Sequence, residues 1–133
     1  MADKFKFTIP GKPAYLTMTR LAIGSIADTM GFDIEEIEDI QTAVSEAGKN
    51  ICCHGLDGFA EEYIVECIAE EGYIEISMTD NSSGNVIERL AKPCMDCPNE
   101  GNLGVFVIKS LMDEVELIDN SQNKKTIRMV KKK

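Results

Sequence analysis

Two successive stretches of helical spacing, set between stretches of strand-like alternation, limit the possible folds of this chain more than any other feature. Across residues 14–30, apolar side chains recur every three or four residues, at Met18, Leu21, Ala22, Ile26 and Met30. This is the period of an amphipathic helix, and Gly31 follows where a helix commonly ends on a glycine. Such a helix must bury its apolar stripe against another layer of the domain.

The second helical stretch carries its own start signal. Asp33 is a favourable N-cap residue and Glu36 stands three residues later, so the pair predicts a capping box. The apolar pattern then continues at Ile34, Ile37, Val44 and Ile51. We expect this helix to run to about His54, where two glycines interrupt the pattern.

Strands account for most of the remaining chain. Alternation of apolar and polar residues predicts strands over 4–9, 61–69, 73–79, 114–119 and 125–130. The run Gly101-Asn102-Leu103-Gly104 predicts the opening of a short helix over 104–112. Residues 85–100 predict a long loop, of a length that commonly serves as a functional lid.

This order of elements favours the α+β class. We expect a two-layer α/β sandwich in which a mixed, mostly antiparallel sheet carries helices on one face, with residues 1–133 forming a single domain. The chain has a formal net charge of −9, which argues against direct nucleic-acid binding because that requires a basic face. No apolar run reaches the roughly 20 residues of a membrane span, so we expect a cytoplasmic protein that contacts no membrane.

Polar side chains at four-residue intervals on the second helix suggest a chemical site. Glu46, Asn50 and His54 share one stripe, and the first two lie roughly opposite the apolar stripe of the same helix. An amide oxygen is a suitable magnesium ligand, and a carboxylate one turn away can accept a proton. This pair predicts half of a magnesium–nucleotide site.

The other half of such a site is offered further along the chain. Asp80 ends a predicted strand and could accept a hydrogen bond from the amino group of adenine. Gly101 and Gly104 precede a helix, where backbone N–H groups and the helix dipole favour phosphate. Each signal is weak by itself, whereas their order and spacing together favour nucleotide binding.

Over nearly its whole length the chain resembles the bacterial anti-sigma factor serine/threonine kinases, which are small members of the histidine-kinase-like ATPase superfamily. Residues 43–54, which begin Ala-Val-Ser-Glu-Ala-Gly-Lys-Asn, resemble the N box of that family. Residues 80–84 resemble a degenerate first glycine box. Residues 101–115, from Gly-Asn-Leu-Gly to Met-Asp-Glu-Val, resemble the second glycine box, and Thr126 resembles the threonine of the last strand.

The resemblance implies a function and a set of site residues. The protein would bind ATP and Mg²⁺, phosphorylate a serine or threonine of an anti-anti-sigma protein, sequester a sigma factor and form a homodimer. Glu46 would be the general base and Asn50 the magnesium ligand. The nucleotide would be bound by the residues Asn50, Asp80, Gly84, Gly101, Leu103, Gly104 and Thr126.

Two positions depart from the family pattern. Ser82 stands where the first glycine box has a glycine, and a serine tolerates positive φ poorly. Glu100 stands where the family often has a basic residue near the phosphates; Lys49 or Lys92 could supply that charge instead. These departures favour an alternative, a module that binds ATP or ADP and sequesters a partner without phosphorylating it. A stand-alone ATPase domain with a different client is a third interpretation.

Other residues leave their alternatives open. Cys94 and Cys97 form a lone CxxC. Three interpretations of the pair stay open: no structural consequence, a lid that is sensitive to redox state, or metal binding. His54 either contacts phosphate or the lid, or it caps the helix C-terminus. Arg20 is either a partner contact or a solvated arginine. An odd count of five cysteines argues against a disulfide framework.

Overall fold

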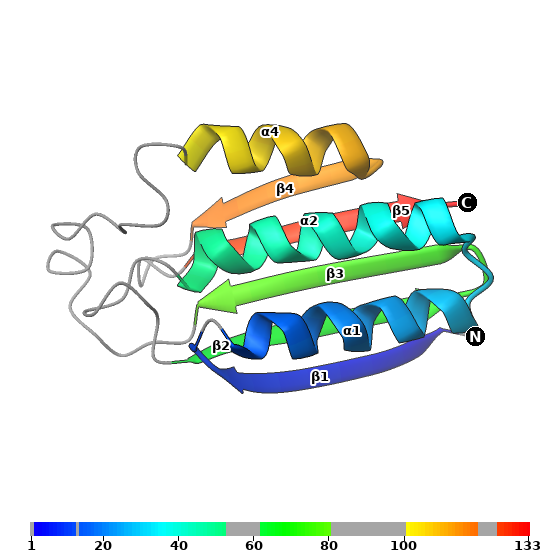
Figure 1. Cartoon of the computed structure of the whole chain (residues 1–133), viewed down its shortest axis with the longest axis horizontal. Helices are drawn as coiled ribbons and strands as arrows, with labels where there is room; N and C mark the ends of the chain where they lie inside the picture. Colours follow the sequence, from blue (N-terminus) through cyan, green and yellow to red (C-terminus); the bar gives the residue numbers. More distant parts are fainter. Residues whose placement is uncertain (1, 13, 53–61, 81–100, 120–124) are drawn as a thin grey trace, which may run out of the picture.

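The fold of the chain was determined as a computed structural model that describes residues 2–12, 14–52, 62–80, 101–119 and 125–133. Its elements, in chain order, are β1 (Asp3–Pro10), α1 (Ala14–Thr29), α2 (Ile34–Cys52), β2 (Glu62–Glu70), β3 (Tyr73–Asp80), α4 (Gly101–Leu111), β4 (Glu114–Asp119) and β5 (Lys125–Lys132). The helices lie side by side over a sheet (Figure 1). Within the described ranges, no helix combines the length and the apolar character needed to cross a membrane.

The described strands form one five-stranded sheet in the order β1-β2-β3-β5-β4. All four neighbouring pairs are antiparallel. The expected α+β sandwich is therefore confirmed, but the expected mixed sheet is wrong for these strands. Strands β3 and β5 are neighbours in the sheet although β4 lies between them in sequence. Strand β4 occupies the edge of the sheet, and the chain then turns back to form β5 between β4 and β3.

Burial alternates along the central strand and so defines two faces of the sheet. On β3, Ile74, Ile76 and Met78 are fully buried, while the residues between them are half-buried. The buried set faces the helices, as expected for a sheet with one covered face. The main core lies between this face and α2, which contributes the buried residues Ile40, Ala43, Val44, Ala47 and Ile51.

The predicted helix boundaries around residues 29–36 are confirmed in detail. Gly31 has a φ of +88°, and the N–H of Phe32 donates to the carbonyl of Ala27, which is the pattern of a Schellman cap. At the start of α2, the Glu36 N–H donates to Asp33 Oδ1 at 2.8 Å, and the Asp33 N–H donates to Glu36 Oε1 at 3.0 Å. This reciprocal pair is the predicted capping box, and it fixes where α2 begins.

One helix start was predicted wrongly. The glycine-rich run was expected to precede a helix at residue 104, whereas α4 begins at Gly101 and ends at Leu111. Packing of α4 on α2 explains this, because tertiary contacts commonly outweigh the low helix propensity of glycine. The predicted lid (85–100), His54, Ser82, Glu100, Cys94 and Cys97 lie outside the described residues.

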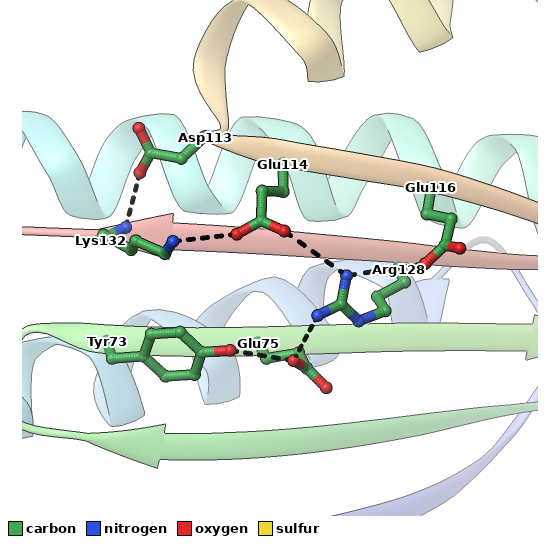
Figure 2. Close-up of polar contacts among 7 residues, drawn as sticks. All are labelled: Tyr73, Glu75, Asp113, Glu114, Glu116, Arg128 and Lys132. Atoms are coloured by element: carbon green, nitrogen blue, oxygen red, sulfur yellow. Dashed lines mark hydrogen bonds and ion pairs between the residues drawn. The ribbon is translucent and has the colours of Figure 1, made fainter.

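The face of the sheet that the helices leave open carries a network of ion pairs (Figure 2). Arg128 on β5 contacts three carboxylates: Glu75 at 2.8 Å, Glu116 at 3.6 Å and Glu114 at 3.9 Å. Tyr73 also donates to Glu75, at 2.9 Å. The hydrogen bond with Glu75 raises the pKa of Arg128, and burial together with that same carboxylate raises the pKa of Tyr73.

This network covers an apolar residue that would otherwise face solvent. Val130 lies opposite Glu75 on β3 and Glu114 on β4, and it is fully buried although it is on the open face. Its neighbours along β5 on the same face are Arg128 and Lys132, and the Lys132 ammonium lies 3.0 Å from Glu114. The long side chains held by these ion pairs therefore shield Val130 with their hydrocarbon stems.

Candidate functional site

The segments singled out in the sequence meet at one end of the molecule. Figure 1 shows that the C-terminal end of α2, the end of β3, the start of β5 and the start of α4 all lie at the same end of the sandwich. Glu46 and Asn50 belong to the last turns of α2, Asp80 is the last residue of β3, and Gly101 is the first residue of α4. The topology therefore gathers residues that are up to fifty-five positions apart in sequence.

Glu46 and Asn50 occupy the side of α2 that faces α4. Glu46 and Asn50 share a narrow sector of the helix surface with Asp39. Asp39 precedes Glu46 by seven residues, which is close to two turns, and Glu46 precedes Asn50 by four, which is close to one turn. The Asp39 carboxylate lies 3.7 Å from Lys131 Nζ, which also donates to the Leu111 carbonyl at the end of α4. Both site residues are half-buried, so they are partly covered although they lie away from the apolar stripe of the same helix.

The Glu46 carboxylate has a charged neighbour on its own helix. Lys49 Nζ lies 3.6 Å from Glu46 Oε1, and the lysine side chain is 53% exposed. A 3.6 Å ion pair with so exposed a lysine contributes little stability and is easily exchanged. The contact therefore leaves Glu46 free to turn toward another partner.

Asp80 is a buried carboxylate at the end of a central strand. It is only 2% exposed, and it continues the alternation of Ile76 and Met78 on the face that the helices cover. Tyr63 on β2 lies directly opposite it and is fully buried. The carboxylate thus sits at the edge of the core, with the strand ending immediately after it.

Thr126 is brought to the same end but to the other face of the sheet. It lies opposite Thr79 on β3, and the two hydroxyl oxygens are hydrogen-bonded at 2.9 Å. Because successive side chains on a strand point to opposite faces, the Thr126 side chain lies on the open face and Asp80 on the covered face. The structure therefore does not bring the Thr126 side chain to the Asp80 carboxylate.

The start of α4 supplies the remaining group. The predicted phosphate-binding residues Gly101, Leu103 and Gly104 form its first turn, where backbone N–H groups lack partners within the helix and favour anions. Gly84, the last predicted residue, lies outside the described residues. Within the described ranges, no group of three or more His, Cys, Asp or Glu residues is placed to hold a metal ion.

Gly48 is a residue whose importance the sequence analysis missed. A Cβ at this position would overlap Leu16 Cδ2 of α1 and would lie 3.5 Å from Met78 Cε of β3. Glycine therefore lets α2 approach α1 and the sheet closely, midway between Glu46 and Asn50. The signal in the sequence is a glycine inside an otherwise regular helical pattern, which often marks close packing.

A hollow of about 590 Å³ lies elsewhere, where α4 ends and β4 begins. It is lined by Lys109, Met112, Asp113, Glu114, Val115, Glu116 and Arg128. These residues belong to the ion-pair network and its neighbours, and none of them is a predicted site residue. The hollow is therefore separate from the candidate site.

Comparison with known proteins gives concordant matches. The histidine kinase-like ATPase domain family matches residues 9–131. The serine-protein kinase RsbW of Listeria monocytogenes is 34% identical over 126 residues, which cover 88% of this chain and 80% of that protein. RsbW of Bacillus pumilus is 35% identical over 130 residues, which cover 90% and 80%.

A solved structure matches the fold at low sequence identity. A chain in the crystal structure of the SiaB-SiaC complex from Pseudomonas aeruginosa superposes with a TM-score of 0.66 and 16% identity, covering 95% of this chain and 88% of that chain. This likeness supports the two-layer architecture alone. The family assignment rests on the sequence matches.

The close approach at Gly48 can be tested by its effect on folding stability. We expect Gly48→Ala to raise the free energy of unfolding by clearly less than the roughly 1 kcal/mol that helix propensity alone would give, because the Leu16 side chain must move to make room. In a Leu16→Ala background the crowding is absent, so the same change should give the full gain of up to about 1 kcal/mol. Urea unfolding followed by circular dichroism measures both, and an equal effect in the two backgrounds would contradict the assignment.

Proposed function

Because the chain belongs to the histidine kinase-like ATPase domain family, and with it to the family of the serine-protein kinase RsbW, we propose that it is an ATP-dependent serine/threonine kinase of the anti-sigma factor type. Its protein substrate is an anti-anti-sigma protein, and it acts in the cytoplasm. The observation that carries this proposal is the meeting of α2, the end of β3 and the start of α4 at one end of the sandwich.

In this proposal Asp80 recognises the base of ATP. A buried carboxylate at a strand end is held in a fixed place, and an ionised carboxylate is a hydrogen-bond acceptor only. It can therefore accept from the exocyclic amino group of adenine and rejects a base that presents an oxygen at that position. The backbone N–H groups of residues 101–104 at the start of α4 take the phosphates.

Glu46 is the proposed general base, which accepts the proton of the attacking hydroxyl. It faces α4, the element whose N-terminus takes the phosphates, and it is only partly solvated. Its contact with Lys49 is long and exposed, so a substrate hydroxyl can replace it. Phosphoryl transfer needs little more from the protein than such positioning and electrostatic stabilisation.

Mg²⁺ is the proposed metal, and Asn50 is its proposed ligand. The donor set fits, since magnesium prefers oxygen ligands and usually takes only one or two from the protein, with water and phosphate completing its shell. Asn50 lies one turn beyond Glu46 on the same half-buried sector. When bound, the metal would neutralise phosphate charge beside the carboxylates of this end.

If the chain is a kinase, loss of the general base should impair phosphoryl transfer without impairing ATP binding. Glu46→Gln should reduce transfer of labelled phosphate from ATP to an anti-anti-sigma protein by a factor of about 10²–10⁴, because the amide cannot accept the proton. ATP binding should be nearly unchanged. Glu38→Gln is the matched control, since Glu38 is exposed on the same helix, and it should transfer at the wild-type rate.

The same experiment decides between the two candidate functions. The departures from the family pattern at Ser82 and Glu100 are the observation that favours a module which binds nucleotide and sequesters a partner without phosphorylating it. Partner binding with no label transfer by the wild type would establish that module and end the kinase proposal. Co-purification with candidate sigma factors then tests whether the sequestered partner is a sigma factor.

The metal proposal predicts a change in magnesium dependence. Asn50→Ala should weaken ATP binding in the presence of Mg²⁺ while leaving the weaker binding measured in EDTA unchanged, because only the metal-dependent part uses the amide. Titration calorimetry with and without EDTA measures this difference. Equal losses under both conditions would mean that Asn50 acts on the nucleotide or the fold and not through the metal.

A homodimer is also part of the proposal, and α1 supplies a suitable surface. Tyr15, Met18 and Leu21 recur every three residues on its outer side and are 37%, 50% and 57% exposed. Beside this helix runs β1, the edge strand of the sheet, whose outer backbone groups can pair with another chain. A second copy would cover both features.

We expect Met18→Asp combined with Leu21→Asp to convert the dimer to a monomer, since two carboxylates would enter an apolar contact. Light scattering coupled to size-exclusion chromatography measures the mass. Ile34→Asp is the control, because Ile34 is 77% exposed on a different helix and should leave the mass unchanged. A dimer that survives the double change would exclude this surface.

A further inference from the structure

A buried hydrogen bond joins α1 to the strand beside the candidate site. Thr19 Oγ1 and Tyr63 Oη lie 2.9 Å apart, and both residues are almost completely buried. Thr19 stands in the first half of α1, and Tyr63 is the second residue of β2. The two residues are forty-four positions apart in sequence, so their hydrogen bond depends on the tertiary fold and not on local structure.

The direction of this hydrogen bond follows from the number of protons available. Thr19 Oγ1 donates to the carbonyl of Tyr15 at 3.0 Å, and a hydroxyl carries only one proton. Tyr63 must therefore donate to Thr19, which accepts. The phenol is fixed at its far end, and its ring cannot swing without losing a buried hydrogen bond.

The fixed ring lies next to the Asp80 carboxylate. Tyr63 and Asp80 are opposite one another in the antiparallel pair of β2 and β3, and both side chains point to the covered face. Side chains paired in this way have Cβ atoms about 4.5–5.5 Å apart and are in contact. The ring thus closes the β2 side of the carboxylate.

We propose that Tyr63, held by Thr19, is a positioning residue that orients the Asp80 carboxylate toward the base of the nucleotide. This inference rests on the proposed function, because it assigns a role within the same site. The tyrosine itself does not contact the base. It restricts the directions in which Asp80 can accept a hydrogen bond, so its loss weakens recognition of the adenine amino group specifically.

The test compares ATP with ITP, whose base carries an oxygen in place of the amino group. For the wild type we expect tighter binding of ATP than of ITP. Tyr63→Phe should reduce ATP affinity about tenfold, which corresponds to the net contribution of one hydrogen bond. It should hardly change ITP affinity. Thr19→Val should have the same effect, Thr19→Ser should restore selectivity, and the double variant should lose no more than either single variant.

Two matched controls separate positioning from general structural damage. Tyr73→Phe also removes a phenol hydroxyl that is hydrogen-bonded, but to Glu75 at the other end of β3. Thr29→Val removes a hydroxyl from the same helix, where it bonds only the Ser25 carbonyl. Neither change should alter the ratio of ATP to ITP affinity.

The outcomes distinguish this inference from the proposed function. If wild type binds ATP selectively and the ratio is as high in Tyr63→Phe and Thr19→Val as in the controls, the positioning role is overturned and ATP binding stands. If wild type binds neither nucleotide, both fail. Should Tyr63→Phe fold poorly, Thr19→Val alone decides, since it leaves the buried ring in place.

Discussion

The close packing of α2 between α1 and β3 is the constraint on which the rest of the structure depends. A Cβ added at Gly48 would overlap Leu16 Cδ2 of α1 and would lie 3.5 Å from Met78 Cε of β3, so a larger residue fits there only if the Leu16 side chain moves. Glu46 and Asn50 flank this point on α2, and Asp80 follows Met78 by two residues on β3. A shift of α2 at Gly48 would therefore move the proposed base and the metal ligand relative to the proposed adenine acceptor at once.

Sequence reasoning found the features that local physics specifies. The capping box at Asp33, the cap at Gly31 and the strand alternation each depend on residues within a few positions, and all are present in the fold. Errors arose where distant packing decides. Helix α4 starts at Gly101, three residues before the predicted start, and it packs on α2, which no local pattern reveals.

The family resemblance contributed what periodicity could not. Glu46, Asn50, Asp80 and Gly101 were grouped by their order in the chain, and the topology brings their elements to one end. Gly48 and Tyr63 were overlooked because their roles exist only between elements. A glycine in a helix hints at close packing but does not identify the neighbour, and a tyrosine in a strand gives no such hint, so only the folded chain shows what each residue contacts.

Apolar residues are buried on both faces of the sheet, but different groups cover them. On the covered face, helices bury the apolar residues of β3, and the buried Tyr63 is held through Thr19 by α1. On the open face, the ion pairs of Arg128 shield Val130 without any helix. In the part of the chain that the structure describes, the covered face links the sheet to α1, whose outer side is apolar and exposed. A partner that binds α1 would therefore contact the helix that fixes Tyr63, which lies opposite Asp80 on the neighbouring strand.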